Sequence, residues 1–325
     1  MAQASLRWRA PSCRAVRRSF PPEAGLAAVV LFWGLNFAVI KVPLAVLPPL
    51  VVNVLRFALS AVVLGAIHAA RSRARGVPMT ATFRAGTAQV IGLGLLGQVV
   101  YQVGFILGID RTTAGAAAIL IAASPLVTAA AGHVLGIDRL RALGWAGFLV
   151  SLAGVGLVVT SHPDASTAST PSDPVGIALL LGAAAAWGLA TVWSRTLLDR
   201  GATALGLSFW GVVLAVPVLG VLAIPDLAGV DWSAVGWPAW AALVYSGALS
   251  TGVAYWLWYD AVQRVGPSRA AAFSNLTPFV GVAAGVAFLG EPFVVLQVAG
   301  GALVIAGLVV MRRERPTRPA VETGA

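Results

Sequence analysis

Two cations stand inside an otherwise apolar stretch of the chain. Lys41 and Arg56 are the only charged residues between Ala24 and Ala70, a region of 47 residues. A cation well inside a membrane span costs about 2.5 to 3.5 kcal/mol on insertion scales, so it is usually kept for a function. No Asp or Glu lies in the middle of any apolar window. The local potential is therefore positive, which favours substrates with a carboxylate or another anionic group.

The spacing of the two cations predicts a common depth. Lys41 is 15 residues after Leu26, about 22 Å along a first helix, and Arg56 is seven residues after Pro49, about 10 Å along a second. Both are expected about a third of the way in from the outer face, where they would hold a carboxylate together. Alternatively, Lys41 reaches the outer headgroups and Arg56 satisfies backbone carbonyls at a helix break.

Uncharged polar residues in the apolar windows would complete such a site. An amide in hydrocarbon needs a partner, so several of these side chains should face the protein interior. The further candidates for substrate contact are Asn36, Gln98, Gln102, Tyr255 and Asn275. Hydrogen bonding between helices is the alternative role for each of them.

Two prolines at matching places are candidate gating joints. Pro125 and Pro278 each fall within an apolar window, where proline removes a backbone hydrogen bond and can kink a helix. A tolerated bend without a gating role is the alternative.

Other chemistries lack the residues that they need. His68, His133 and His162 are far apart, and Cys13 is the only cysteine, so we predict no metal site. The glycines of Gly92–Gly97 match G-x-G-x-x-G but lie inside an apolar window without the strand that a dinucleotide site requires. No Walker phosphate loop is present. We therefore predict no cofactor and no enzymatic activity.

The elements that position these residues are membrane spans. Hydrophobic residues make up 58% of the 325 positions and charged residues only 10%, which is outside the range of soluble domains. Each charge-free window below can cross about 30 Å of hydrocarbon as a helix. These windows are 85–109, 112–137, 142–163, 174–194, 201–225, 232–259, 270–290 and 292–311. Pro48-Pro49 divides the region from Ala24 to Ala70 into two more, so we predict an all-α polytopic membrane protein of ten transmembrane helices.

The basic excess indicates topology rather than a nucleic-acid partner. The net charge is +10, and 19 of the 22 basic residues fall on one side of the predicted spans. The positive-inside rule then places both termini in the cytoplasm. Residues 1–23 and 312–325 are predicted to be basic cytoplasmic tails, and 161–173 an external linker that carries only acidic charge.

The chain matches itself when it is shifted by 153 or 154 positions. The predicted repeats are 24–160 and 174–311, with five spans each. Because five is odd, the second repeat enters the membrane the opposite way round, an arrangement common in secondary transporters that open a central site to either side. The most informative matches are Trp33-Gly34 with Trp187-Gly188, Lys41 with Arg195, Arg111 with Arg264, Pro125 with Pro278, and Asp138 with Glu291.

Two segments resemble a known family. The stretch FWGLNFAVIKVPLAVLPPLVVNVLRFALSAVV at 32–63 is similar to the opening hairpin of the EamA-like branch of the drug/metabolite transporter superfamily. Residues 246–310 are similar to its closing helices. The resemblance covers nearly all of 24–311. It implies a ten-helix bundle of two five-helix repeats in an inner membrane that moves small metabolites, often outward.

The resulting prediction is a secondary transporter of the bacterial inner membrane. A single Lys against 21 Arg is typical of a GC-rich bacterial genome. The expected partners are the lipid bilayer and a small-molecule substrate, an amino acid or a related anionic or zwitterionic compound, carried by alternating access and exported. The alternatives are a drug or purine/nucleoside exporter, a passive channel, and a membrane-embedded lipid-modifying enzyme. The sequence leaves open whether the protein is a monomer or a homodimer.

Overall fold

The computed structural model of the protein describes residues 21–134, 142–160, 173–266, 270, 273–274 and 276–313. Asn275 and nearly all of the predicted tails and linker lie outside these residues. Within the described ranges every regular element is a helix and none is a strand. The predicted all-α class is therefore confirmed.

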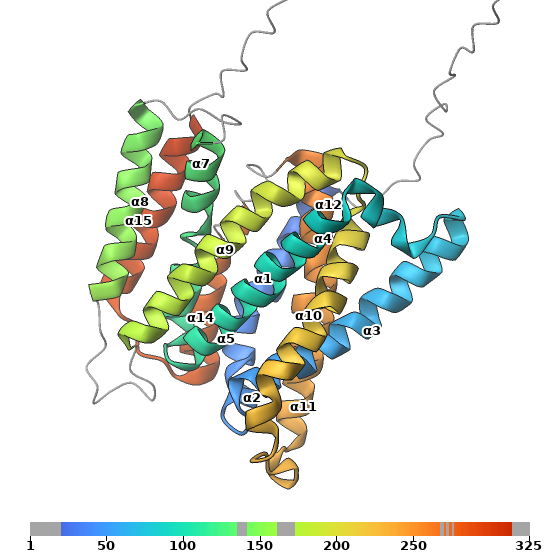
Figure 1. Cartoon of the computed structure of the whole chain (residues 1–325). Helices are drawn as coiled ribbons and strands as arrows, with labels where there is room; N and C mark the ends of the chain where they lie inside the picture. Colours follow the sequence, from blue (N-terminus) through green and yellow to red (C-terminus); the bar gives the residue numbers. More distant parts are fainter. Residues whose placement is uncertain are drawn as a thin grey trace, which may run out of the picture.

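Among the described elements, η1 and η3 are 3₁₀ helices, whereas η2 and η4 are π-helices. In chain order the helices are α1 (Pro22–Val39), α2 (Lys41–Leu44), α3 (Pro49–Arg75), η1 (Met79–Ala85), α4 (Thr87–Gly94), η2 (Leu95–Val100), α5 (Tyr101–Asp110), α6 (Ala114–Ile121), α7 (Ser124–Val134), α8 (Ala142–Thr160), α9 (Pro174–Asp199), α10 (Ala204–Leu227), η3 (Trp232–Ala234), α11 (Trp237–Val244), η4 (Tyr245–Val253), α12 (Ala254–Val265), α14 (Thr277–Leu289) and α15 (Val295–Arg313). Figure 1 shows them gathered in one bundle, with α2 and α11 at its lower end, called the α2 end below.

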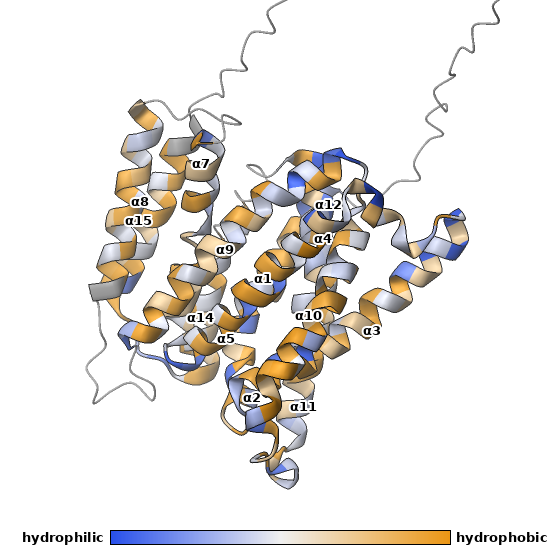
Figure 2. Ribbon diagram, in the orientation of Figure 1, coloured by the Kyte–Doolittle hydropathy of each residue, from blue (hydrophilic) through white to orange (hydrophobic). Residues whose placement is uncertain are grey.

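Several of these helices are long and apolar enough to cross a membrane. Six stretches qualify by length and composition: Pro22–Leu44, Pro49–Arg75, Thr87–Asp110, Ala114–Val134, Pro174–Asp199 and Ala204–Leu227. Shorter apolar helices occupy Ala142–Val158, Thr277–Leu289 and Val295–Val310. In Figure 2 apolar residues cover most of the long helices, and hydrophilic residues gather near helix ends, as on α3. A helical protein with several membrane-span candidates is confirmed, whereas the ten-span topology and the side of the termini stay predictions.

Proline and glycine set the limits of the helices next to the site. Pro49 opens α3, because proline in the first turn gives up no intrahelical hydrogen bond. The predicted division of Ala24–Ala70 at Pro48-Pro49 is thereby confirmed. At the other end of the chain α14 stops at Gly290, whose φ of 64° lies in the left-handed region that glycine adopts without strain. The chain turns there and brings Glu291 back toward α14.

Pro125 and Pro278 occupy the same helical position. Pro125 is the second residue of α7, which follows a break after Ile121. Pro278 is the second residue of α14. First-turn positions have no intrahelical acceptor for their N–H groups, so both prolines are accommodated without loss of a bond. Their use as gating joints stays a prediction.

Two π-helical segments interrupt corresponding helices. The segment η2 lies between α4 and α5, and η4 lies between α11 and α12. Shifted by 153 positions, Leu95–Val100 falls on residues 248–253, which are inside η4. π-Helical turns are rare and frequently occur at functional sites.

Close contacts recur at matching positions of the two halves. A side chain on Gly34 of α1 would overlap Val280 and approach the Thr277 carbonyl of α14. On Gly188 of α9 it would lie 2.6 Å from the Ser124 carbonyl and 3.0 Å from Val127 of α7. These glycines, like their partners, match in the self-alignment. Small residues let membrane helices approach closely, so both pairings depend on glycine.

The helices α8 and α15 lie side by side at the left edge of Figure 1. A Cβ on Gly154 would lie 2.6 Å from the Gly300 carbonyl oxygen, so the two backbones nearly touch. The Ser151 hydroxyl donates to the carbonyl of Val304 at 2.6 Å, and these residues are 153 positions apart. Matching positions of the two predicted repeats therefore meet each other here.

Candidate functional site

A cavity of about 50 Å³ lies in the middle of the bundle and is lined by both halves of the chain. Polar and aromatic side chains alternate around it. The lining residues are Trp33, Asn36, Phe37, Arg56, Tyr101, Gln102, Phe105, Ala118, Ile121, Ala122, Ser124, Trp187, Ser250, Thr251, Tyr255, Ser274, Thr277 and Pro278. Four of the predicted substrate contacts, Asn36, Arg56, Gln102 and Tyr255, are thus brought to one place.

Arg56 is the charged residue of this lining. Its side chain comes from α3 and is only 2% exposed. Nη1 donates to Asn53 Oδ1 at 3.4 Å and Nη2 donates to Thr251 Oγ1 at 3.0 Å. The guanidinium carbon lies 5.9 Å from the ring centre of Phe105. All of these partners are neutral, and Nε has none within the described part of the chain.

The polar atoms around the cavity are incompletely satisfied. Gln102 of α5 donates from Nε2 to the hydroxyl of Tyr255 on α12. Its Oε1 has no hydrogen-bond partner among the described residues, nor do Asn36 Oδ1 and Thr277 Oγ1. Buried polar atoms are normally hydrogen-bonded, and each exception calls for an explanation. A ligand with both donors and acceptors would supply the missing partners.

Aromatic rings form one wall of the cavity. Trp33 from α1 and Trp187 from α9 meet edge to face with ring centres 5.5 Å apart. Tyr255 stacks on Trp187 at 5.4 Å, and Tyr101 packs on it at 5.0 Å. Trp33 is held by its Nε1, which donates to the Ser250 carbonyl at 2.9 Å. These contacts form a wall that can pack against an apolar group or hold a cation over the face of a ring.

Gln98 lies beside the cavity and does not line it. The residue is buried at 1% exposure in η2, and its side chain contacts the hydroxyl of Tyr259. A Cβ on Gly211 of α10 would lie 3.1 Å from Gln98 Cγ. The structure thus gives Gln98 helix-packing contacts, and substrate binding by it stays a prediction.

Lys41 lies away from the cavity, at the α2 end. The helix α1 ends at Val39, so Lys41 begins the separate helix α2. Its Nζ donates to the carbonyl of Thr112, just beyond α5. Glu291 and Asp110 are the carboxylates that attract its charge. The structure therefore does not bring Lys41 and Arg56 together around one substrate group.

Glu291 closes the same end of the bundle. Its Oε1 accepts from the backbone N–H of Ala114 at 2.6 Å and Oε2 accepts from that of Gly115 at 3.0 Å. These are the first residues of α6, where unpaired N–H groups and the helix dipole favour an anion. The carboxylate belongs to the turn before α15, so it joins segments 176 residues apart.

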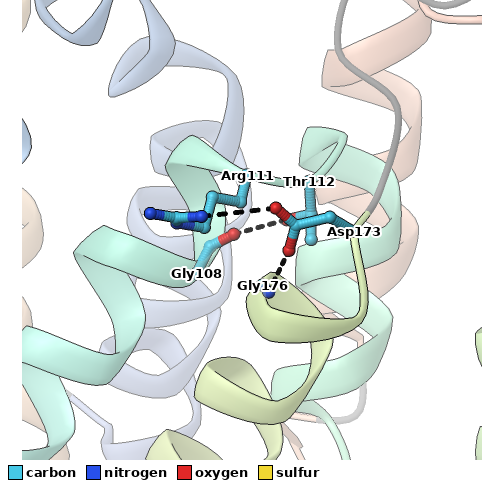
Figure 3. A network of polar contacts seen from close by, with 5 residues as sticks. All are labelled: Gly108, Arg111, Thr112, Asp173 and Gly176. Carbon is cyan, nitrogen blue, oxygen red and sulfur yellow. Dashed lines mark hydrogen bonds and ion pairs between the residues drawn. The ribbon is translucent and has the colours of Figure 1, made fainter.

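A further network joins α5 to α9 at this end (Figure 3). Arg111 Nη1 lies 3.4 Å from Asp173 Oδ2. Asp173 also caps α9 by accepting from the Gly176 N–H. The Thr112 hydroxyl donates to the Gly108 carbonyl at 2.9 Å. The ion pair is exposed, at 49% and 41% for the two side chains, so it positions helix ends rather than a ligand.

Sequence reasoning missed some residues of the lining. Thr251, which holds Arg56, and Thr277, with its unpartnered hydroxyl, were not among the predicted contacts. The self-alignment contained a signal for Thr251, because a shift of 153 places it on Gln98. Asn275, which was predicted, lies outside the described residues. Within the described ranges no three His, Cys, Asp or Glu side chains gather as a metal would require.

Comparison with known proteins identifies the family. The EamA-like transporter family matches residues 23–160 and again residues 174–313. An uncharacterized transporter of Archaeoglobus fulgidus is 28% identical over 292 residues, which cover 89% of this chain and 98% of the relative. A probable amino-acid metabolite efflux pump of Salmonella typhimurium is 28% identical over 295 residues, which cover 87% and 91% of the two chains. A solved structure with 19% identity shares the fold with a TM-score of 0.59 over 90% of this chain and 98% of that one. With both halves matched, this chain belongs to the EamA-like transporter family.

Proposed function

We propose that the protein is a secondary transporter that exports an amino acid or a related anionic or zwitterionic metabolite across the bacterial inner membrane. The observation that carries the proposal is the central cavity around Arg56, a buried guanidinium whose partners are neutral. The similarity to a relative named as a probable amino-acid metabolite efflux pump supports the same class.

The cavity offers both kinds of hydrogen-bonding group that a zwitterion needs. Arg56 supplies donors for a carboxylate, because only two hydrogen bonds from its guanidinium are found among the described residues. The unpartnered oxygens of Asn36 and Gln102 can accept from an ammonium group. The aromatic wall can take the apolar part of the molecule.

Alternating access of two five-helix repeats is the proposed mechanism. Its support is that contacts recur at matching positions. Gly34 of α1 packs against α14, and Gly188 of α9 packs against α7. Two halves with similar contacts can exchange conformations around a site on their boundary. Arg56 lies at that boundary, since it belongs to the first half and bonds to Thr251 of the second. Pro125 and Pro278 are the proposed joints.

Counterflow in proteoliposomes tests the function directly. Vesicles are loaded with one unlabelled compound from a panel of amino acids, nucleosides and organic acids, and uptake of its labelled form is followed. We expect transient accumulation of one carboxylate-bearing class, and we expect Arg56→Ala to reduce it by roughly a hundredfold or more, because the charged donor is lost.

The panel also separates the alternatives. Counterflow of nucleosides or of cationic compounds, unaffected by Arg56→Ala, would overturn the proposed site and favour a drug or nucleoside exporter. The Arg111→Gln variant is the matched control, since its arginine is exposed and lies away from the cavity. Both variants are first checked for the same elution profile and thermal stability in detergent.

A further inference from the structure

Among the described residues, no carboxylate forms an ion pair with Arg56. The ion pairs within the described residues are Arg111 with Asp173, Arg195 with Asp199 and Arg264 with Asp260, all partly exposed. Arg56 is 2% exposed, and its hydrogen-bond partners are a carboxamide and a hydroxyl. Buried charges in proteins are normally paired, because desolvation is costly. A transported carboxylate would pair with Arg56 only while the substrate is bound.

We propose that the Arg56 site also binds chloride, which replaces the organic substrate after its release and is carried back in exchange. This inference rests on the proposed function and adds a second, inorganic substrate to the same site. Chloride supplies a negative charge and is small enough for a cavity of about 50 Å³.

The size of the cavity favours a small ion. One water-sized particle needs about 10 to 15 Å³ of such space, and the cavity measures about 50 Å³. A halide therefore fits without moving the lining. Water would fill the same space but would leave the guanidinium charge in place.

The chemistry of the lining also suits a halide. Arg56 retains N–H donors, of which Nε has no partner, and Thr277 has an unpartnered hydroxyl that can donate. No carboxylate among the described residues lines the cavity to repel an anion. Arg56 itself is only 2% exposed, and burial strengthens the attraction between a guanidinium and an anion.

The exchange has a consequence for charge movement. If the substrate is a zwitterion, it carries no net charge while chloride carries one negative charge, so each one-for-one exchange moves one charge across the membrane; exchange of a monovalent anion for chloride moves none. Transport should therefore respond to a potassium diffusion potential set with valinomycin, and an exchange of two zwitterions should not.

Labelled chloride is the probe for the test. Proteoliposomes are loaded with potassium chloride or with potassium sulfate, which has no carboxylate, and uptake of radiolabelled chloride is followed. We expect chloride-loaded vesicles with the wild-type protein to exceed both sulfate-loaded and protein-free vesicles by roughly tenfold. Arg56→Gln should bring the uptake down to the protein-free level, because the buried cation is lost. Arg56→Lys should retain part of the uptake, and Arg111→Gln should retain all of it.

The outcomes separate this inference from the proposed function. Organic counterflow that depends on Arg56, with chloride uptake no higher than in protein-free vesicles, would overturn the chloride site and leave the transporter standing. If the wild-type protein shows counterflow of none of the organic compounds in the panel, the proposed transport function itself is overturned. If Arg56→Gln does not fold, the wild-type protein alone gives the test. Vesicles that contain potassium sulfate and the organic substrate should take up labelled chloride if the two are exchanged, and failure to do so would overturn the chloride site.

Discussion

The central cavity and the α2 end each contain a cation within an apolar stretch of sequence, yet their surroundings differ. Lys41 at the α2 end donates to a backbone carbonyl and is attracted by Glu291 and Asp110. Arg56 in the cavity has the neutral partners Asn53 and Thr251. Carboxylates of the protein thus attract the first charge, whereas the hydrogen-bond partners of the second among the described residues are neutral.

The comparison suggests a criterion for choosing which buried cation to test for substrate binding. Both residues satisfy the rule that a charge within a membrane span is costly and retained for a reason. The rule does not say whether the reason is stability or transport. The chemical nature of the nearest acceptors makes that distinction, and it is visible only once distant segments such as Thr112 and Thr251 have been brought near the cations.

The largest expected effect is the contrast between the two cations. Arg56→Gln should abolish counterflow. Lys41→Gln should leave it within roughly threefold of wild type, because Arg56 is the one of these two cations that would contact the substrate. Initial rates in proteoliposomes at equal protein density measure both. An equal loss of counterflow in both variants would contradict the proposal that only the cation in the central cavity takes part in transport.

Thr251 should have the next largest effect, as a positioning residue for Arg56. Thr251→Val keeps the shape but removes the acceptor of Nη2, and a hydrogen bond from a charged donor contributes about 1.5 to 3 kcal/mol. We expect the KM for substrate to rise roughly tenfold with a smaller change in maximal rate, and Thr251→Ser to restore it.

A matched threonine controls for burial. Thr191 is 3% exposed, compared with 1% for Thr251, and its hydroxyl bonds only to the Trp187 carbonyl of its own helix. Thr191→Val should therefore keep a normal KM. An equal rise in both variants would mean that Thr251 acts through packing.

Glu291 should affect stability more than transport. Glu291→Gln leaves one of the first N–H groups of α6 facing an amide NH₂ group instead of an oxygen, at a cost of about 2 kcal/mol. Thermal unfolding in detergent should show a lower midpoint. The control is Glu23→Gln, an exposed acid in the first turn of α1, which should leave the midpoint nearly unchanged.

The smallest effects are expected from the exposed pair of Arg111 and Asp173. Asp173→Asn keeps the cap of α9 and loses only a surface ion pair, worth about 0 to 1 kcal/mol. Asp173→Ala loses the cap as well and should cost about 1 kcal/mol more. Unfolding midpoints at low and high salt distinguish the contribution of the ion pair from that of the helix cap, since salt screens only the ion pair.

Much of the fold followed from the sequence because its causes are local. Charge-free windows mark long apolar helices, and Pro48-Pro49 marks the turn that opens α3. The self-alignment placed Gln102 opposite Tyr255, and these two side chains are in contact. The charge-free windows and the prolines can be found from neighbouring residues, and the repeat from comparing the chain with itself, so none of them needed tertiary information.

The site was less predictable because helix geometry is interrupted near it. The depth of Lys41 was measured along one unbroken helix, whereas α1 ends at Val39. Gln98 and Gln102 are one turn apart, but Gln98 belongs to the π-helical segment η2, where the rotation per residue differs from that of an α-helix. Only Gln102 therefore lines the cavity. Pro43 is a local signal for the first interruption, because proline has no N–H to bond back to Val39, whereas neighbouring residues give no such signal for the π-helical segment.

The contact between Gln102 and Tyr255 also bears on how such a site can arise by gene duplication. These residues hold matching places, 153 positions apart. In a symmetric dimer of separate identical chains, a residue that meets its counterpart meets a copy of itself. Fusion of the halves into one gene lifts that constraint: a glutamine can face a tyrosine, and Arg56 can match Phe209, a residue without charge. A single polypeptide can thereby evolve an asymmetric site that binds an asymmetric molecule in one orientation.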